Sequence, residues 1–193
     1  SAPVPHNYGA DSPYQRPTDM AGDKSSDIEW VRHALETLAR EGRAFEVFSL
    51  LRPTSPCRKP ETIMRAMEQF MAEQGVDSLR AIEKCAQHPG KMWIVRGKRM
   101  HPLMPMCPEA VPYHSTQYAA LPAVYVQNAS LEIAWSRLPL EQGSIAGEVL
   151  TPFFTEVDEG IDVNQPDDWR LLKMALPGGA ATLPLIDHPP YAS

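Results

Sequence analysis

The spacing of apolar residues changes along the chain and predicts a mixture of helices and strands. Residues 27–41 have apolar side chains every three or four positions, which is typical of a helix with one buried face. Those positions are Ile28, Val31, Leu35 and Leu38. Ser26 and Glu29 form a capping-box pattern at the start of this helix, and Gly42 ends it.

Further elements follow from short apolar runs and from the residues that interrupt them. A buried strand is expected at 44–51, and a second helix begins at Pro60 and ends before Gly75. Later elements are a strand at 77–84, a hairpin of 91–95 with 99–103, strands within 124–135 and 145–154, and a helix at 167–176. This order predicts a layered α/β fold with a parallel sheet.

Proline and glycine mark the segments outside these elements. Residues 104–123 form a long proline-broken stretch, and loops of this length in compact domains usually have a function or contact a partner. The 193 residues suffice for one domain, which we place at 1–176, followed by a Pro/Gly-rich tail at 177–193.

Composition excludes several classes of function. The chain has a net charge of −6 and mixed charges, so binding of nucleic acid through a basic surface is not expected. Its three cysteines form no CxxC pair, which argues against a zinc knuckle and a disulfide framework. Without an apolar run long enough for a membrane span or a visible signal peptide, we expect a cytoplasmic protein.

The strongest local motif is the Arg52-Pro-Thr54-Ser55-Pro segment, which directly follows the first predicted strand. Loops at the carboxyl ends of parallel strands face the crevice in which α/β proteins bind ligands. A guanidinium and two hydroxyls there suit phosphate or carboxylate oxygens. The alternative is a proline-stiffened turn whose hydroxyls bond the nearby backbone.

A second motif, Gly-Ile-Asp162-Val-Asn164, precedes the last predicted helix. In an extended segment Asp162 and Asn164 share one side, where their oxygens could hold Mg²⁺ together with substrate phosphates. Alternatively, Asn164 caps the helix that begins near Pro166.

Two further groups carry weaker signals. Arg16, Ser25 and Ser26 lie at or before a helix N-terminus, where exposed amides suit an anion or a nucleotide, although simple capping by Ser26 is also expected. Gln117, Tyr125 and Asn128 lie in a segment that mixes polar and apolar residues, which is equally consistent with an ordinary strand entry. The histidines show no ligand spacing.

In this order, the motifs resemble the acylneuraminate cytidylyltransferase family, over roughly residues 8–176. The matching strings are YGADSPYQRP, AGDKSSDIEWVRHALE, LLRPTSPCRKPETIMRAMEQF, HSTQYAALPAVYVQNASL and EGIDVNQPDDW. The resemblance implies a Rossmann-like layered sheet of the nucleotide-diphospho-sugar transferase type, with a protruding dimerisation region at about 80–123. It also implies a homodimer that uses CTP and Mg²⁺ to activate an acidic, sialic-acid-like sugar.

The resemblance also assigns roles to residues. Arg16, Ser25 and Ser26 match positions near the nucleotide, and Arg52, Thr54 and Ser55 match the loop between nucleotide and sugar. Asp162 and Asn164 match the two metal-binding positions. Gln117, Tyr125 and Asn128 match the sugar pocket, part of which faces a neighbouring protomer. Arg52 and Asp162 are therefore the expected catalytic residues.

This chain departs from the family pattern in three ways. Arg52 stands where the family often has glutamine, and Asn164 stands where it has a second aspartate. The N-terminal strand and the basic, glycine-containing nucleotide loop have no counterpart, so we expect a C-terminal part of such an enzyme. Two alternatives remain: a non-catalytic binding module of the same fold, and a nucleotidyltransferase for another acid such as 3-deoxy-manno-octulosonate.

Overall fold

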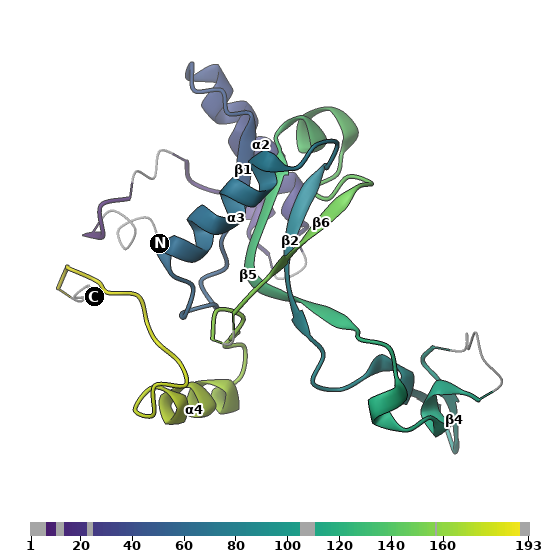
Figure 1. Ribbon diagram of the computed structural model, residues 1–193. Helices are drawn as coiled ribbons and strands as arrows, with labels where there is room; N and C mark the ends of the chain where they lie inside the picture. Colours follow the sequence, from purple (N-terminus) through teal and green to yellow (C-terminus); the bar gives the residue numbers. More distant parts are fainter. Residues whose placement is uncertain (1–6, 11–13, 23–24, 105–110, 157, 190–193) are drawn as a thin grey trace.

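The computed structural model describes residues 7–10, 14–22, 25–104, 111–156 and 158–189 (Figure 1). Its helices are α2 (Asp27–Arg40), α3 (Pro60–Ala72) and α4 (Pro166–Ala175). Its strands are β1 (Val47–Leu50), β2 (Ser78–Lys84), β3 (Trp93–Arg96), β4 (Arg99–Pro102), β5 (Tyr125–Trp135) and β6 (Leu150–Phe154). Single turns of 3-10 helix occur at η1 (Thr18–Met20), η2 (Pro89–Lys91), η3 (Tyr113–Ser115) and η4 (Tyr118–Ala120), and a π-helical turn, η5, at Leu138–Gln142. Each helix and strand predicted from periodicity is therefore confirmed, with ends that shift by a few residues.

The main sheet has four strands in the order β1-β5-β2-β6. The predicted all-parallel sheet is wrong, because β5 runs antiparallel to both β1 and β2, whereas β2 and β6 are parallel. Strands β1, β2 and β6 consequently run in one direction. Their carboxyl ends meet at the same edge, so the loops that follow them can build one site.

The pairing of β5 with β2 is interrupted by a wide bulge. Arg80 pairs with Glu132 and Ile82 pairs with Gln127, so two steps along β2 correspond to five along β5. Bulges of this kind bend a strand and re-aim its side chains, often beside functional sites. Asn128 and Ser130 lie in this bulge.

Helices cover the two faces of the sheet, which gives the layered α/β arrangement. Ala66 and Phe70 of α3 pack on Leu79, Leu131 and other residues of one face. Val31 and Leu35 of α2 pack with Leu50 of β1 on the other face. Because successive side chains of a strand alternate between faces, β1 contributes to both clusters. The described helices include none that is long and apolar enough to cross a membrane.

Residues 85–104 and 111–124 form an arm that projects from the sheet between β2 and β5 (Figure 1). The arm contains the β3–β4 hairpin, whose strands are almost entirely exposed. At its base, buried His88 bonds the Gly90 amide and the Pro122 carbonyl oxygen. The predicted protrusion is thus present, and its role in dimer formation stays a prediction.

Candidate functional site

The turn after β1 and the loop after β6 lie side by side at the carboxyl edge of the sheet. The amide of Val163 donates a 2.8 Å hydrogen bond to the carbonyl oxygen of Thr54. This bond places Asp162, the preceding residue, beside the Arg52–Ser55 turn. The two motifs that the sequence separates by more than a hundred residues therefore form one site.

Arg58 fixes the turn against the bulge of β5. Its guanidinium donates to the Arg52 carbonyl oxygen at 3.1 Å and, through a very short contact, to the Ser130 carbonyl oxygen. Burial lowers the pKa of Arg58. The arginine replaces backbone pairing that the bulge removes, and it joins the turn to the strand that carries Asn128.

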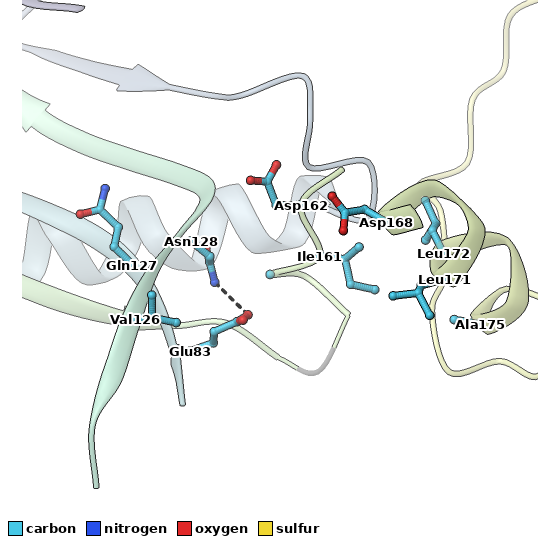
Figure 2. Close-up of a pocket in the computed structure, with 11 residues that line it drawn as sticks. Glu83, Val126, Gln127, Asn128, Ile161, Asp162, Asp168, Leu171, Leu172 and Ala175 are labelled. Carbon is cyan, nitrogen blue, oxygen red and sulfur yellow. Dashed lines mark hydrogen bonds between the residues drawn. The ribbon is translucent and has the colours of Figure 1, made fainter. Parts of the chain in front are cut away.

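Two adjoining cavities open at this edge. The larger, of about 510 Å³, lies between the strands and α4 (Figure 2), and its lining residues are Glu83, Val126, Gln127, Asn128, Gly160, Ile161, Asp162, Asp168, Leu171, Leu172 and Ala175. The smaller, of about 310 Å³, is lined by Arg52, Gln127, Asn128, Ala129, Glu132 and Asp162. Gln127, Asn128 and Asp162 line both, so the cavities are parts of one ligand-sized hollow.

Arg52 belongs to a row of alternating charges beneath the smaller cavity. Its guanidinium pairs closely with both carboxylate oxygens of Asp27 and lies 3.7 Å from Glu132, which also pairs with Arg80. The hydrogen bond from Arg52 holds the pKa of Asp27 below its ordinary value. Arg52 is thus held at the cavity by acidic neighbours, of which Asp27 comes from the first turn of α2.

Asp162 has the features expected of a metal ligand. Its Oδ2 accepts a 2.5 Å hydrogen bond from Asn164 Nδ2, whereas its buried Oδ1 has no hydrogen-bond partner among the described residues. A carboxylate oxygen that is buried without a partner is costly, and a divalent cation would satisfy it. Within the described residues no group of three His, Cys, Asp or Glu side chains could hold a metal.

Asn164 does not cap α4. The N-cap residue is Gln165, and the Asp168 carboxylate accepts from the amides of Asn164 and Gln165 at 3.0 and 2.8 Å. The capping interpretation is wrong because Asn164 lies one residue before the N-cap position and its side chain donates to Asp162. Asn164 instead orients Asp162.

Asn128 sits at the centre of a hydrogen-bonded group. Its Nδ2 donates to Thr155 Oγ1 at 2.9 Å and to Glu83 Oε2 at 3.3 Å, and its Oδ1 accepts from the Ser130 amide at 3.2 Å. Figure 2 shows the Asn128 amide facing the Glu83 carboxylate across the cavity wall. Asn128 lines both cavities and its polar atoms already have partners, and its contact with a sugar stays a prediction.

The loop that carries Asp162 is anchored by Glu159. This buried carboxylate accepts from Thr62 Oγ1 at 2.5 Å, from Arg65 at 2.8 Å and from the Glu156 amide at 2.8 Å. Burial by itself raises the pKa of Glu159, but these hydrogen bonds together lower it. Neighbouring Asp158 accepts from Lys59 and from Thr182, so the start of α3 and the C-terminal segment also hold the loop.

The predicted nucleotide contacts divide into two groups. Arg16 stacks over Trp30 of α2, with 4.3 Å between its Cζ and the ring centroid, and Ser25 Oγ accepts from the Gly22 amide. Ser26 is the N-cap of α2, but the predicted capping box is wrong, because its side chain makes no cap hydrogen bond. Asp27 and Glu29 supply favourable negative charge at this terminus instead.

The other group belongs to the turn. Thr54 contributes its carbonyl oxygen to the contact with Val163. Ser55 is buried, and its Oγ has no hydrogen-bond partner in the part of the chain that the structure describes.

Two predicted sugar contacts lie away from the cavities. Gln117 is exposed in the arm, and Tyr125, at the start of β5, packs its ring on Phe154 with 5.1 Å between centroids. Neither lines either cavity. A contact of these residues with a neighbouring protomer stays a prediction.

Sequence analysis missed several residues of the site, among them Glu83, Gln127, Glu132, Asp168 and Arg58. Glu132 and Arg58 carry a detectable signal, since charged residues within or beside apolar runs need buried partners. Glu83, near the end of a strand, carries no comparable signal.

A cavity at the carboxyl ends of strands in a layered α/β fold is the arrangement by which this class of protein binds its ligands. No family model matches the chain. A CMP-N,N'-diacetyllegionaminic acid synthase from Legionella pneumophila is 30% identical over 176 residues, which cover 88% of this chain and 71% of that protein. An N-acylneuraminate cytidylyltransferase from Escherichia coli is 37% identical over 67 residues, which cover 35% of this chain and 15% of that protein.

The chain therefore belongs to the acylneuraminate cytidylyltransferase (CMP-sialic acid synthetase) family, and it is a nucleotidyltransferase.

Proposed function

We propose that this protein transfers the CMP group of CTP to an acidic nine-carbon sugar of the sialic-acid type and releases pyrophosphate. The supporting observation is the meeting of the Arg52–Ser55 turn with Asp162 at one hollow, through the bond of Val163 to Thr54. The names of the two relatives, which refer to legionaminic and neuraminic acids, support the class of sugar.

The proposed reaction is a single displacement at phosphorus. The anomeric hydroxyl oxygen of a 2-keto-3-deoxy sugar acid forms a bond to the α-phosphorus of CTP. The bond from that phosphorus to the oxygen bridging to the β-phosphate breaks, pyrophosphate leaves, and the hydroxyl proton is released to solvent. The task of the protein in such a transfer is to position the reactants and to offset the developing charge.

Asp162 suits a magnesium-binding role in this reaction. Its unpartnered Oδ1 offers the carboxylate oxygen that Mg²⁺ prefers, and Asn164 fixes the other oxygen. When bound, Mg²⁺ would offset the negative charge of the phosphates. Asp162 and Asn164 are the proposed metal-site residues of this chain.

Arg52 is the proposed contact for the carboxylate of the sugar. A guanidinium has five N–H donors, and the close pairing with Asp27 takes one donor from each terminal nitrogen. Among the described residues, Asp27 is the recorded hydrogen-bond acceptor of this guanidinium and Glu132 lies 3.7 Å away, so the remaining donors can meet a second carboxylate in the cavity that Arg52 lines. Asp27 would then act by orienting Arg52.

The test is a pyrophosphate-release assay with the full-length gene product, CTP and MgCl₂. The panel of acceptors contains N-acetylneuraminate, N,N'-diacetyllegionaminate and 3-deoxy-manno-octulosonate. We expect turnover with at least one nine-carbon acid and loss of turnover when EDTA removes the metal. Turnover with the octulosonate alone would contradict the proposed sugar class. No turnover with any acid would contradict the proposed reaction and favour a binding module.

We also propose that the arm pairs with a second copy of the chain. Its hairpin exposes Trp93, Ile94, Val95 and Met100. A two-stranded hairpin has little stability by itself in water, so packing against a partner would stabilise it. An exposed apolar surface of this kind is typical of a protein interface. The association state of a variant with a charge on the exposed hairpin tests this assignment.

A further inference from the structure

The two cavities of the hollow differ in the charged side chains that line them. Arg52 lines only the smaller cavity, together with Glu132, whereas Glu83 and Asp168 line only the larger one, and Asp162 lines both. A guanidinium is therefore present among the lining residues of the smaller cavity, and the charged lining residues of the larger cavity are carboxylates. This difference favours the orientation in which the carboxylate of an acidic sugar lies at Arg52.

Glu83 retains capacity to accept hydrogen bonds from a ligand. In the described part of the chain, the Asn128 Nδ2 donor at 3.3 Å is its recorded partner, and no Lys, Arg or His pairs with it. A carboxylate accepts at about four lone-pair positions, so most of its capacity is unused. The side chain is only half buried and lies on the cavity wall.

The surroundings of Glu83 hold it in a defined place. Asn128, which donates to it, is fixed by Thr155 and by the Ser130 amide. Gly160 closes the other side: a Cβ added there would overlap Glu83 Oε2 and lie 2.6 Å from Asn128 Nδ2. The glycine thus permits the carboxylate to occupy this position, where any other residue would displace it.

We infer that Glu83 is a specificity-determining residue that accepts a hydrogen bond from an N–H or O–H group of the sugar acid, at a position remote from the sugar carboxylate. This inference rests on the proposed function. A carboxylate at this end repels the anionic groups of the substrates and favours a neutral donor. A sugar that lacks the donor would displace water from this carboxylate without replacing its hydrogen bond, and a site built to pair a polar group rejects such an analogue.

The experiment combines protein variants with altered sugars. Full-length wild type, Glu83→Gln and Glu83→Ala are assayed with the panel acid that the wild type prefers. Its deoxy analogues, each lacking one donor group beyond the keto-acid end, are assayed in parallel. Glu83→Gln preserves an oxygen for Asn128 but presents an amide to the ligand. Glu73→Gln, an exposed glutamate at the end of α3, is the control.

We expect Glu83→Gln to raise KM for the sugar roughly 10- to 100-fold, with KM for CTP and Tm nearly unchanged. With the wild type, one deoxy analogue should have a KM raised by about the same factor. With Glu83→Ala, the same analogue should raise KM less than about threefold, because the effects of removing two interacting groups are not additive. Equal losses for every analogue in wild type and variant would overturn the inference and leave Glu83 a structural role. A wild type without turnover would instead refute the proposed function itself.

Discussion

At the scale of single residues, several side chains of the site act by holding a neighbour in place. Asn164 fixes one oxygen of Asp162, Asp27 pairs with Arg52, and Asn128 contacts Glu83. Residues that hydrogen-bond a metal ligand or a substrate-contacting side chain fix the orientation of that side chain. In each pair, the first residue positions the second. The residues proposed to contact metal or substrate are therefore Asp162, Arg52 and Glu83.

Replacement of Asp162 by alanine should remove the oxygen that we assign to Mg²⁺. We expect kcat/KM to fall at least about 100-fold, because charge on the phosphates is no longer offset, while Tm changes little. A steady-state pyrophosphate assay across a range of MgCl₂ concentrations measures the effect.

Asp167→Ala is the matched control for this variant. Asp167 lies nearby in the first turn of α4, but its carboxylate is exposed and pairs only with Arg170 among the described residues. Equal losses in Asp162→Ala and Asp167→Ala would show that the effect is not specific to the proposed metal site.

Replacement of Gly160 by alanine should lower activity in a protein that still folds. The added Cβ overlaps Glu83 Oε2 and lies 2.6 Å from Asn128 Nδ2, so both side chains have to shift. We expect a loss of about 1–3 kcal/mol in unfolding free energy and of at least tenfold in kcat/KM. Gly178→Ala, where the Cβ meets nothing closer than 4.0 Å, is the control, and wild-type activity in Gly160→Ala would contradict this account.

At the scale of elements, the loop after β6 is held by α3 as well as by the sheet, where Thr155 bonds the Ile82 carbonyl oxygen of β2. Glu159 receives hydrogen bonds from Thr62 and Arg65, both of α3. The position of Asp162 thus depends on a helix whose other face packs in the core through Ala66 and Phe70. The packing of α3 in the core therefore helps to hold this part of the site in place.

Glu159→Gln should weaken this anchor in a manner that depends on pH. The pKa of Glu159 is below its ordinary 4.5 in the folded protein, so its contribution to stability is complete above pH 4.5 and is lost as the pH falls through the lowered value. We expect the variant to lose about 2 kcal/mol at pH 7, and the difference from wild type to shrink below pH 4.5.

Urea unfolding at several pH values measures this difference. Glu156→Gln, which removes an exposed partner of the same Arg65, should cost less than about 1 kcal/mol. A pH-independent difference between wild type and Glu159→Gln would contradict the assigned role.

The elements could be predicted from the sequence, whereas their pairing could not. The helices at Asp27–Arg40 and Pro60–Ala72 follow from local periodicity, which a single sequence records. The antiparallel direction of β5 depends on contacts between distant segments, which have no local signature. Similarly, the sequence around Ser26 is typical of a helix cap. Nothing near it in the sequence indicates that the Asp27 carboxylate pairs with Arg52.

The candidate site could also be predicted only in part. Arg52 and Asp162 stand out because their motifs carry charge at strand ends, and the structure brings them to one cavity. Glu83 reaches the cavity only because β5 bulges and Gly160 leaves room. These are properties of the tertiary structure, so sequence alone did not reveal the carboxylate.

At the scale of the whole molecule, the described residues of the arm lie outside the hydrophobic clusters of the protein. Val95 of its hairpin is 69% exposed, so a charged residue there should leave the isolated chain folded. If the arm pairs with a second copy, Val95→Lys should place a charge in an apolar interface and shift the protein to the monomer. Sedimentation equilibrium measures the change, with Lys98→Ala at the hairpin turn as the control. A monomeric wild type would contradict the proposed pairing.

Strand β5 extends from the arm at Tyr125, past the bulge and Asn128 in the cavity wall, to Trp135 beside the core. One strand thus links the exposed apolar hairpin to the hollow of the proposed site, with Arg58 bridging it to the turn that bears Arg52. If the arm pairs with a second copy of the chain, association would fix the arm end of this strand. Turnover per chain should then rise with protein concentration, and dilution should lower it.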